Sequence, residues 1–161
     1  MRRVRGRKRA IATGAFILVM TLAGVPMAAA ATVTVATAGD IARATIGTPQ
    51  KKTADLVTAM RPAKVLVLGD AQYDLGEFSN FLQSYDPTWG SFNSIAAPVP
   101  GNAEYKTPNA AGYFQYFAGV LSPYGETATD PSKGYYSFNI GDWHVVALNS
   151  NCGLAGVNCT A

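Results

Sequence analysis

The hydrophobic and polar positions of this chain predict strands that alternate with helices. Residues 64–68 place four apolar side chains in a row, which is typical of a strand buried on both faces. Threonine and valine alternate over residues 32–38 and predict an earlier strand, and residues 95–99 predict a short third strand that Pro98 weakens. Because helical segments are expected between the strands, we expect βαβ units with parallel strands.

Two helices are expected beside this sheet. Thr48 and Pro49 supply an N-cap and a first helical residue, and Arg61-Pro62 ends that helix. A second helix is predicted near residues 74–85. The apolar face of the first helix consists of Leu56, Val57 and Met60, and that of the second of Leu75, Phe78, Leu82 and Tyr85.

The C-terminal third of the chain is expected to hold an aromatic helix and a hairpin. Residues 109–121 carry closely spaced aromatic side chains, which we interpret as core packing because no basic face accompanies them for stacking nucleic-acid bases. Residues 135–140 and 143–149 predict a hairpin around Gly141-Asp142. The predicted fold class is therefore α/β, with βαβ units and a C-terminal hairpin.

The N-terminus has the three regions of a secretory signal peptide. Residues 1–9 carry six basic side chains, residues 10–25 are mostly apolar, and small residues follow up to residue 31. We expect cleavage near residue 31 and a secreted mature protein without a membrane span, although an uncleaved anchor stays open. Seven basic and ten acidic residues then remain, a net charge of −3 that gives no support to nucleic-acid binding.

Two cysteines stand close together near the C-terminus. An exported protein folds in an oxidising environment, so we expect a disulfide between Cys152 and Cys159. A metal site built by these two thiolates alone is the less favoured interpretation. The bridge would close a short loop rich in small residues.

Polar residues follow all three predicted strands of the sheet. They are Asp40 and Asp70, each after a glycine and 30 residues apart, and Asn102, which follows Gly101 and lies 32 residues after Asp70. The carboxyl ends of parallel strands meet at one edge of an open sheet, where ligands bind. Carboxylate and amide oxygens suit hard metal ions, and the phenol of Tyr73 would favour a trivalent ion such as Fe(III). A carboxylate that only caps a turn or a helix is the alternative.

These residues resemble the calcineurin-like metallophosphoesterases, and most of all the purple acid phosphatase branch. That branch uses Gly-Asp, then Gly-Asp-x-x-Tyr, then Gly-Asn-His-Glu/Asp. Here the corresponding stretches are Gly39-Asp40, Gly69-Asp70-Ala71-Gln72-Tyr73 and Gly101-Asn102-Ala103-Glu104. The similarity extends over residues 33–152. It implies a two-sheet β-sandwich flanked by helices, of which residues 32–161 would be the N-terminal portion.

The resemblance also implies a role for each matching residue. Asp40 and Tyr73 would bind a first metal ion, Asp70 would bridge two ions, and Asn102 would bind the second through its amide oxygen. The ions would be Fe, Mn or Zn. In this family two metal ions hold a phosphate ester and activate the water that attacks phosphorus.

The sequence departs from the family pattern in two places. Ala103 stands where the family has a histidine, so no catalytic side chain is assigned there and turnover should fall, by about 10²–10⁴-fold if that histidine is a general acid. The family's later histidine ligands are absent, and His144, the one histidine, is expected to be a buried structural residue. We therefore expect a truncated, weakly active or inactive phosphoester hydrolase with apolar sheet surface left exposed.

Two other classes of protein compete with this interpretation. A non-catalytic exported module that binds a metal or a partner is the main alternative, and Ala103 favours it. A nucleotide-binding domain is disfavoured, because the chain has neither Gly-x-Gly-x-x-Gly nor a P-loop lysine.

Overall fold

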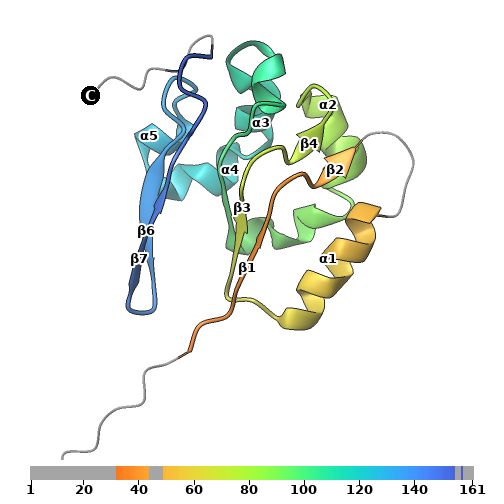
Figure 1. Cartoon of the computed structure of the whole chain (residues 1–161), viewed down its shortest axis with the longest axis vertical. Coiled ribbons are helices and arrows are strands. Elements are labelled where there is room, and N and C mark those ends of the chain that lie inside the picture. The colour runs from red at the N-terminus through yellow and green to blue at the C-terminus, as the bar shows by residue number, and fades with distance from the viewer. Residues whose placement is uncertain (1–31, 44–48, 155–156, 158–161) are drawn as a thin grey trace, which may run out of the picture. The chain divides into compact units, whose positions relative to one another are not determined.

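The computed structural model of the chain describes residues 32–43, 49–154 and 157. The expected signal peptide, residues 1–31, lies outside the described residues. The described part is a mixed α/β structure in which short helices accompany three small sheets (Figure 1). Within it, no helix is both long enough and apolar enough to cross a membrane.

The main sheet consists of three parallel strands with β3 in the middle. They are β1 (Val35–Ala38), β3 (Lys64–Val67) and β5 (Ala96–Pro98). Val65 of β3 lies beside Ala36 on one side and Ala96 on the other. The predicted strands and their parallel direction are confirmed, so the carboxyl ends of all three strands lie at one edge of the sheet.

The central strand β3 is buried on one face only. Val65 and Val67 are fully buried, whereas Leu66 is half-buried and Leu68, just after the strand, is 58% exposed. The prediction of burial on both faces is therefore wrong. Leu66 and Leu68 line a cavity of about 140 Å³ together with residues of the hairpin β6 (Tyr136–Ile140) and β7 (Trp143–Ala147), so this face is incompletely covered.

A short second ladder continues the pairing of β1 and β3 beyond their ends. It joins β2 (Ala42–Arg43) to β4 (Gln72–Tyr73) in parallel. The backbone N–H groups of Ile41 and Ala42 donate to the carbonyl oxygens of Asp70 and Ala71, each over 3.0 Å. Since pairing resumes after each Gly-Asp turn, the two turns are held side by side.

The helix α1 (Pro49–Met60) begins at the predicted proline and ends just before Arg61. Its predicted N-cap, Thr48, lies outside the described residues. Ala54 and Val57 are buried, but Leu56 and Met60 are 64% and 58% exposed. The helix is thus confirmed. Its predicted apolar face is wrong apart from Val57, because only Ala54 and Val57 of α1 are buried against the rest of the molecule.

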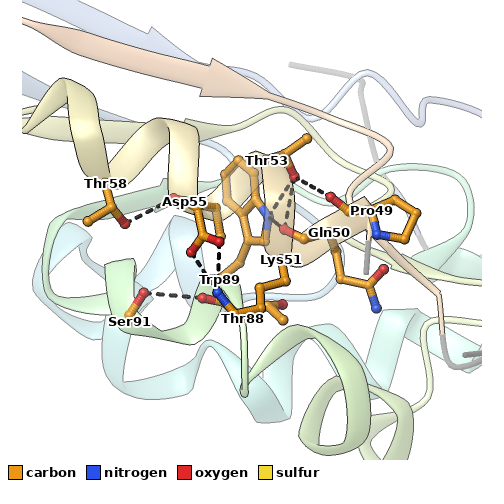
Figure 2. Close-up of polar contacts among 10 residues, drawn as sticks. Pro49, Gln50, Lys51, Thr53, Asp55, Thr58, Thr88, Trp89 and Ser91 are labelled. Carbon is orange, nitrogen blue, oxygen red and sulfur yellow. Dashed lines mark hydrogen bonds and ion pairs between the residues drawn. The ribbon is translucent and has the colours of Figure 1, made fainter. Parts of the chain in front are cut away.

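Trp89 fixes the first turns of α1. It is almost fully buried at the start of η2 (Trp89–Ile95), a 3₁₀ helix. Its indole nitrogen Nε1 lies 3.0 Å from the carbonyl oxygen of Gln50 and 3.3 Å from the hydroxyl of Thr53. Figure 2 draws both contacts as dashed lines. A buried indole needs an acceptor, so this contact sets where α1 lies against η2.

The helix predicted over residues 74–85 begins four residues later. It consists of α2 (Phe78–Asn80) and the π-helical turn η1 (Phe81–Tyr85). At Gly76 the chain turns with φ +64°, and a methyl group there would lie 2.5 Å from the Cα of Glu104. This close approach to a distant loop replaces the predicted first helical turn.

The apolar face predicted for this helix is confirmed at the buried Tyr85 and half-buried Phe78 but is wrong at the two leucines. Leu75 and Leu82 are 46% and 50% exposed, and Phe81 is fully buried together with Tyr85. Phe81 and Tyr85 are four residues apart, so they form one face of the wider turn in η1. A period of 3.6 residues therefore assigned Leu75 and Leu82 to the buried face, although both are exposed.

Aromatic rings pack the helical side of the molecule. Phe117 lies between α3 (Ala111–Tyr116) and α4 (Ala118–Leu121), with its ring 5.6 Å from Phe81 and 5.0 Å from Tyr113 in centroid distance. All three rings are buried, which confirms core packing for residues 109–121. The remaining short helical elements are η3 (Glu104–Lys106), η4 (Pro108–Ala110), η5 (Ser122–Tyr124) and α5 (Glu126–Thr129).

The predicted hairpin is confirmed, but not the expected burial of His144. His144 pairs with Asn139 across β6 and β7, is exposed, and has its Nδ1 2.7 Å from the side-chain oxygen of Asn139. On the same strand Trp143 and Val146 are 74% and 58% exposed. The apolar pattern of β7 therefore led to a wrong prediction for His144, because much of this strand remains exposed in the described part of the chain.

The predicted disulfide lies partly outside the described residues. Cys152 is disulfide-bonded in the structure. Cys159, the partner expected for it, is not among the described residues, so the pairing of these two residues stays a prediction.

Candidate metal centre

Asp40 and Asp70 occupy equivalent positions at the ends of β1 and β3. Each follows a glycine, and each has a left-handed backbone, with φ of 54° and 49°. Such a conformation costs a residue other than glycine on the order of 1–3 kcal/mol, and it is found preferentially at functional sites. The β2–β4 pairing that follows the turns holds both aspartates in this conformation.

The second and third strand ends touch through their backbones. A methyl group on Gly69, where φ is +91°, would lie 2.7 Å from the Cα of Gly101. A methyl group on Gly101 would lie 2.1 Å from Oδ1 of Asp70. Only glycine allows this approach, which explains why a glycine precedes the polar residue at both strand ends.

The hydroxyl of Tyr73 lies between the two carboxylates. It contacts Oδ1 of Asp40 and is 2.5 Å from Oδ2 of Asp70. A phenol has one proton and can donate to one carboxylate at a time, so three oxygens share a single proton. The hydrogen bond to Asp40, followed by that to Asp70, raises the pKa of Tyr73 above its ordinary value, because both carboxylates hold the proton.

This donor set fits a hard cation. A cation among these oxygens would take the place of the shared proton and offset the charge of two carboxylates. Carboxylate and phenol oxygens are the ligands that trivalent and hard divalent ions prefer. The nearby Arg43 forms an ion pair with Asp74, its Nη2 lying 3.1 Å from the carboxylate.

An open cleft of about 550 Å³ lies at this edge of the sheet. Asp40, Asp70 and Asn102 all line it, and the side chain of Asn102 is exposed. Leu148 and Ser150 line the same cleft from the segment that follows β7. The structure therefore brings three of the four predicted ligands to one cleft, and the fourth, Tyr73, contacts two of them.

Ala103 does not face this cleft. Its side chain is fully buried and does not line the cavity. Its backbone N–H donates to Oδ1 of Asp70 over 2.9 Å, which leaves Oδ2 toward Tyr73. The backbone of Ala103 therefore orients Asp70, a predicted ligand. The side chain of Ala103 brings no proton donor to the cleft.

Glu104, the last residue of the third motif, lies fully buried beneath the strand ends. Burial raises its pKa, and the backbone N–H groups of Gln72, Gly101 and Asp70, which donate to it, oppose that shift. The signal in the sequence was that Glu104 occupies the Glu/Asp position of the Gly-Asn-His-Glu/Asp motif, for which no role was expected.

Two asparagines fix the opposite wall of the cleft. Asn149 donates to the hydroxyl of Tyr105 over 2.8 Å and to the carbonyl oxygen of Lys133 over 2.9 Å. Asn151 donates to the side-chain oxygen of Asn149 and to the carbonyl oxygen of Pro100, over 2.8 and 2.9 Å. The segment after β7 is thereby tied to the loop that carries Asn102.

Histidine and cysteine contribute nothing to this cleft in the part of the chain that the structure describes. No group of three or more His, Cys, Asp or Glu side chains that could hold a metal ion occurs there. The predicted set contains two aspartates only, and a phenol and an amide complete it. His144 lies on the hairpin and does not line the cleft.

No family model, curated protein or solved structure significantly matches this chain.

Proposed function

We propose that the cleft binds a metal ion and that the chain is a metal-dependent phosphoester hydrolase of low activity. The observation that carries this proposal is the position of the Tyr73 hydroxyl, which contacts the carboxylates of both Asp40 and Asp70. The resemblance of the three strand-end stretches to the calcineurin-like metallophosphoesterases supports a phosphate ester as substrate. The incompletely covered sheet face supports a partial two-sheet sandwich, and the leader pattern supports secretion.

Each residue of the cleft has a distinct part in this proposal. Asp40 and Tyr73 would hold a first ion, the Asp70 carboxylate would contribute beside them, and Asn102 would offer its amide oxygen to a second. The phenol favours Fe(III), and Mn or Zn are the alternatives. A bound ion supplies positive charge to the phosphate ester and activates a water nucleophile. The N–H of Ala103 keeps the Asp70 carboxylate in place for this task.

Low activity follows from the position of Ala103. A general acid would protonate the departing alcohol, and such a group contributes about 10²–10⁴-fold. The buried methyl group of Ala103 offers no proton. The same observation favours the second candidate function, a non-catalytic metal-binding module.

Metal titration tests the proposed site. Ferric citrate added to the chain should produce a visible charge-transfer absorption, because a tyrosine phenolate bound to Fe(III) absorbs there. Tyr73→Phe should abolish this absorption and weaken binding by about 10–100-fold. Tyr135→Phe is the matched control, since Tyr135 is exposed and, unlike Tyr73, forms no hydrogen bond with Asp40 or Asp70 in the described part of the chain, and it should leave both unchanged.

Turnover of p-nitrophenyl phosphate separates the two candidate functions. The metal-loaded chain should hydrolyse it slowly, and Tyr73→Phe should remove that activity. Metal binding without any Tyr73-dependent hydrolysis would establish the non-catalytic module. A chain that binds neither Fe(III), Mn(II) nor Zn(II) would contradict the proposal as a whole.

A further inference from the structure

Glu104 makes three hydrogen bonds that join separate parts of the chain. Its Oε2 accepts the backbone N–H of Asp70 over 2.9 Å and that of Gly101 over 2.7 Å. Its Oε1 accepts the N–H of Gln72 over 3.1 Å. One side chain thus binds the turn after β3, the start of β4 and the loop after β5.

A carboxylate is the group that these three donors require. Carboxylate oxygens only accept, and two of them can take several N–H groups at once, whereas an amide would turn its own donors toward an N–H. The ion pairs of the described residues do not include Glu104. Burying a charge without a cationic partner is costly. The hydrogen bonds from the two loops offset this cost and keep the carboxylate of Glu104 in its buried position.

The two loops joined in this way carry predicted ligands. Asp70 is itself one of the residues whose N–H binds Glu104, and Asn102 follows Gly101 directly. The loops touch so closely that a methyl group fits at neither glycine, as described above. A change in the Glu104 contacts therefore changes the separation between the Asp70 carboxylate and the Asn102 amide.

We propose that Glu104 is a positioning residue, whose buried carboxylate clamps the second and third strand ends together and thereby sets the spacing of the metal ligands. The metal part of this inference rests on the proposed function. The clamp itself concerns backbone amides and is measurable without metal.

Amide hydrogen exchange tests the clamp in the metal-free chain. The N–H groups of Asp70, Gln72 and Gly101 should exchange much more slowly than exposed loop amides, although only Gln72 begins a strand. Glu104→Gln should speed their exchange at least tenfold while the amides of β3 keep their protection. Rapid exchange of the three amides in the unaltered chain would overturn the clamp. This part of the test needs no variant protein.

Metal affinity then separates positioning from general stability. Glu104→Gln should weaken Fe(III) binding by about 10–100-fold at a temperature where the variant is folded. Leu121→Ala, which removes a buried side chain in α4, is the control: it should lower Tm but keep the affinity of the folded chain. Equal affinity in Glu104→Gln and the unaltered chain would overturn the inference.

A second variant covers the case in which Glu104→Gln does not fold. Glu104→Asp keeps the charge and the acceptors but shortens the side chain, so it should fold and show intermediate amide protection. Failure of the unaltered chain to bind any metal, with the three amides protected, would refute the proposed function and leave the clamp standing.

Discussion

The strand-end cleft and the β6–β7 hairpin are built on opposite principles. In the cleft, polar groups meet defined partners: Tyr73 contacts two carboxylates, and Glu104 accepts three backbone N–H groups. On the hairpin, several apolar side chains are left exposed, and Trp143 and Val146 are 74% and 58% exposed. The first region is held by specific hydrogen bonds between segments far apart in the sequence, whereas much of the second is exposed to solvent.

This difference separates two kinds of stability in the molecule. Hydrogen bonds and close backbone contacts in the cleft have strict geometry, so a small change there affects several partners at once. An exposed apolar side chain on β7 makes few contacts, so its removal affects little. Substitutions in the two regions should therefore have very different effects.

The largest effect is expected for Gly101→Ala. Its methyl group would lie 2.1 Å from Oδ1 and 2.2 Å from the backbone N of Asp70, so the two loops must separate. We expect the free energy of unfolding to fall by about 3 kcal/mol and metal binding to disappear. Urea denaturation and Fe(III) titration measure the two effects.

Gly119→Ala is the control for this prediction. Gly119 lies in α4, and outside its chain neighbours and the backbone of its own helix no atom lies within 4 Å of the position that its methyl group would take. Because alanine favours helices, this variant should gain up to about 1 kcal/mol. Similar stability in the two variants would show that the strand ends do not touch as described.

A smaller effect is expected for Ala103→His, which inserts the family's histidine. Position 103 is fully buried and does not line the cleft, so the ring has no space there. We expect a loss of about 1–3 kcal/mol in the free energy of unfolding and no gain in p-nitrophenyl phosphate hydrolysis. Ser150→His, at an exposed position that lines the cleft, should change stability by less than about 0.5 kcal/mol.

A large gain in turnover by Ala103→His would contradict the buried placement of this residue. It would mean that the loop after β5 opens toward the cleft when a larger side chain is present. The difference between positions 103 and 150 thus tests which wall of the cleft is rigid.

The sequence predicts the sheet and the gathering of polar residues at its edge because both follow from local patterns. Short apolar runs between turn residues determine the three strands, and parallel direction brings their ends together. Asp40, Asp70 and Asn102 could therefore be assigned to one edge before the structure was known. Topology brings these residues to one edge, but the cleft there also needs the segment after β7 as a wall.

The contacts that hold this edge together could not be predicted, because they join residues far apart in the chain. Glu104 accepts the N–H of Asp70, 34 positions earlier, and a glycine turn against Glu104 displaces the start of α2. Periodicity describes a residue's own element and contains no information about such partners. The same limit explains why the exposure of His144 was missed.

The smallest effect is expected on the hairpin, for Trp143→Thr. Trp143 is 74% exposed and threonine suits a strand, so stability should change by less than about 0.5 kcal/mol. Tyr136→Thr on the paired strand is the contrast: Tyr136 is 4% exposed and its hydroxyl lies 2.7 Å from the carbonyl oxygen of Pro98. Its loss should cost about 3 kcal/mol, measured by urea denaturation.

The contrast within one hairpin tests whether the exposed surface of β7 is free in solution. A loss above about 1 kcal/mol for Trp143→Thr would mean that a contact beyond the described residues covers this surface. A second copy of the chain would make that loss depend on protein concentration, whereas a contact within the chain would not. Repeating the denaturation at tenfold dilution therefore distinguishes a contact between copies from a contact within the chain. If the surface is free, Trp143→Thr should leave the free energy of unfolding unchanged at both concentrations.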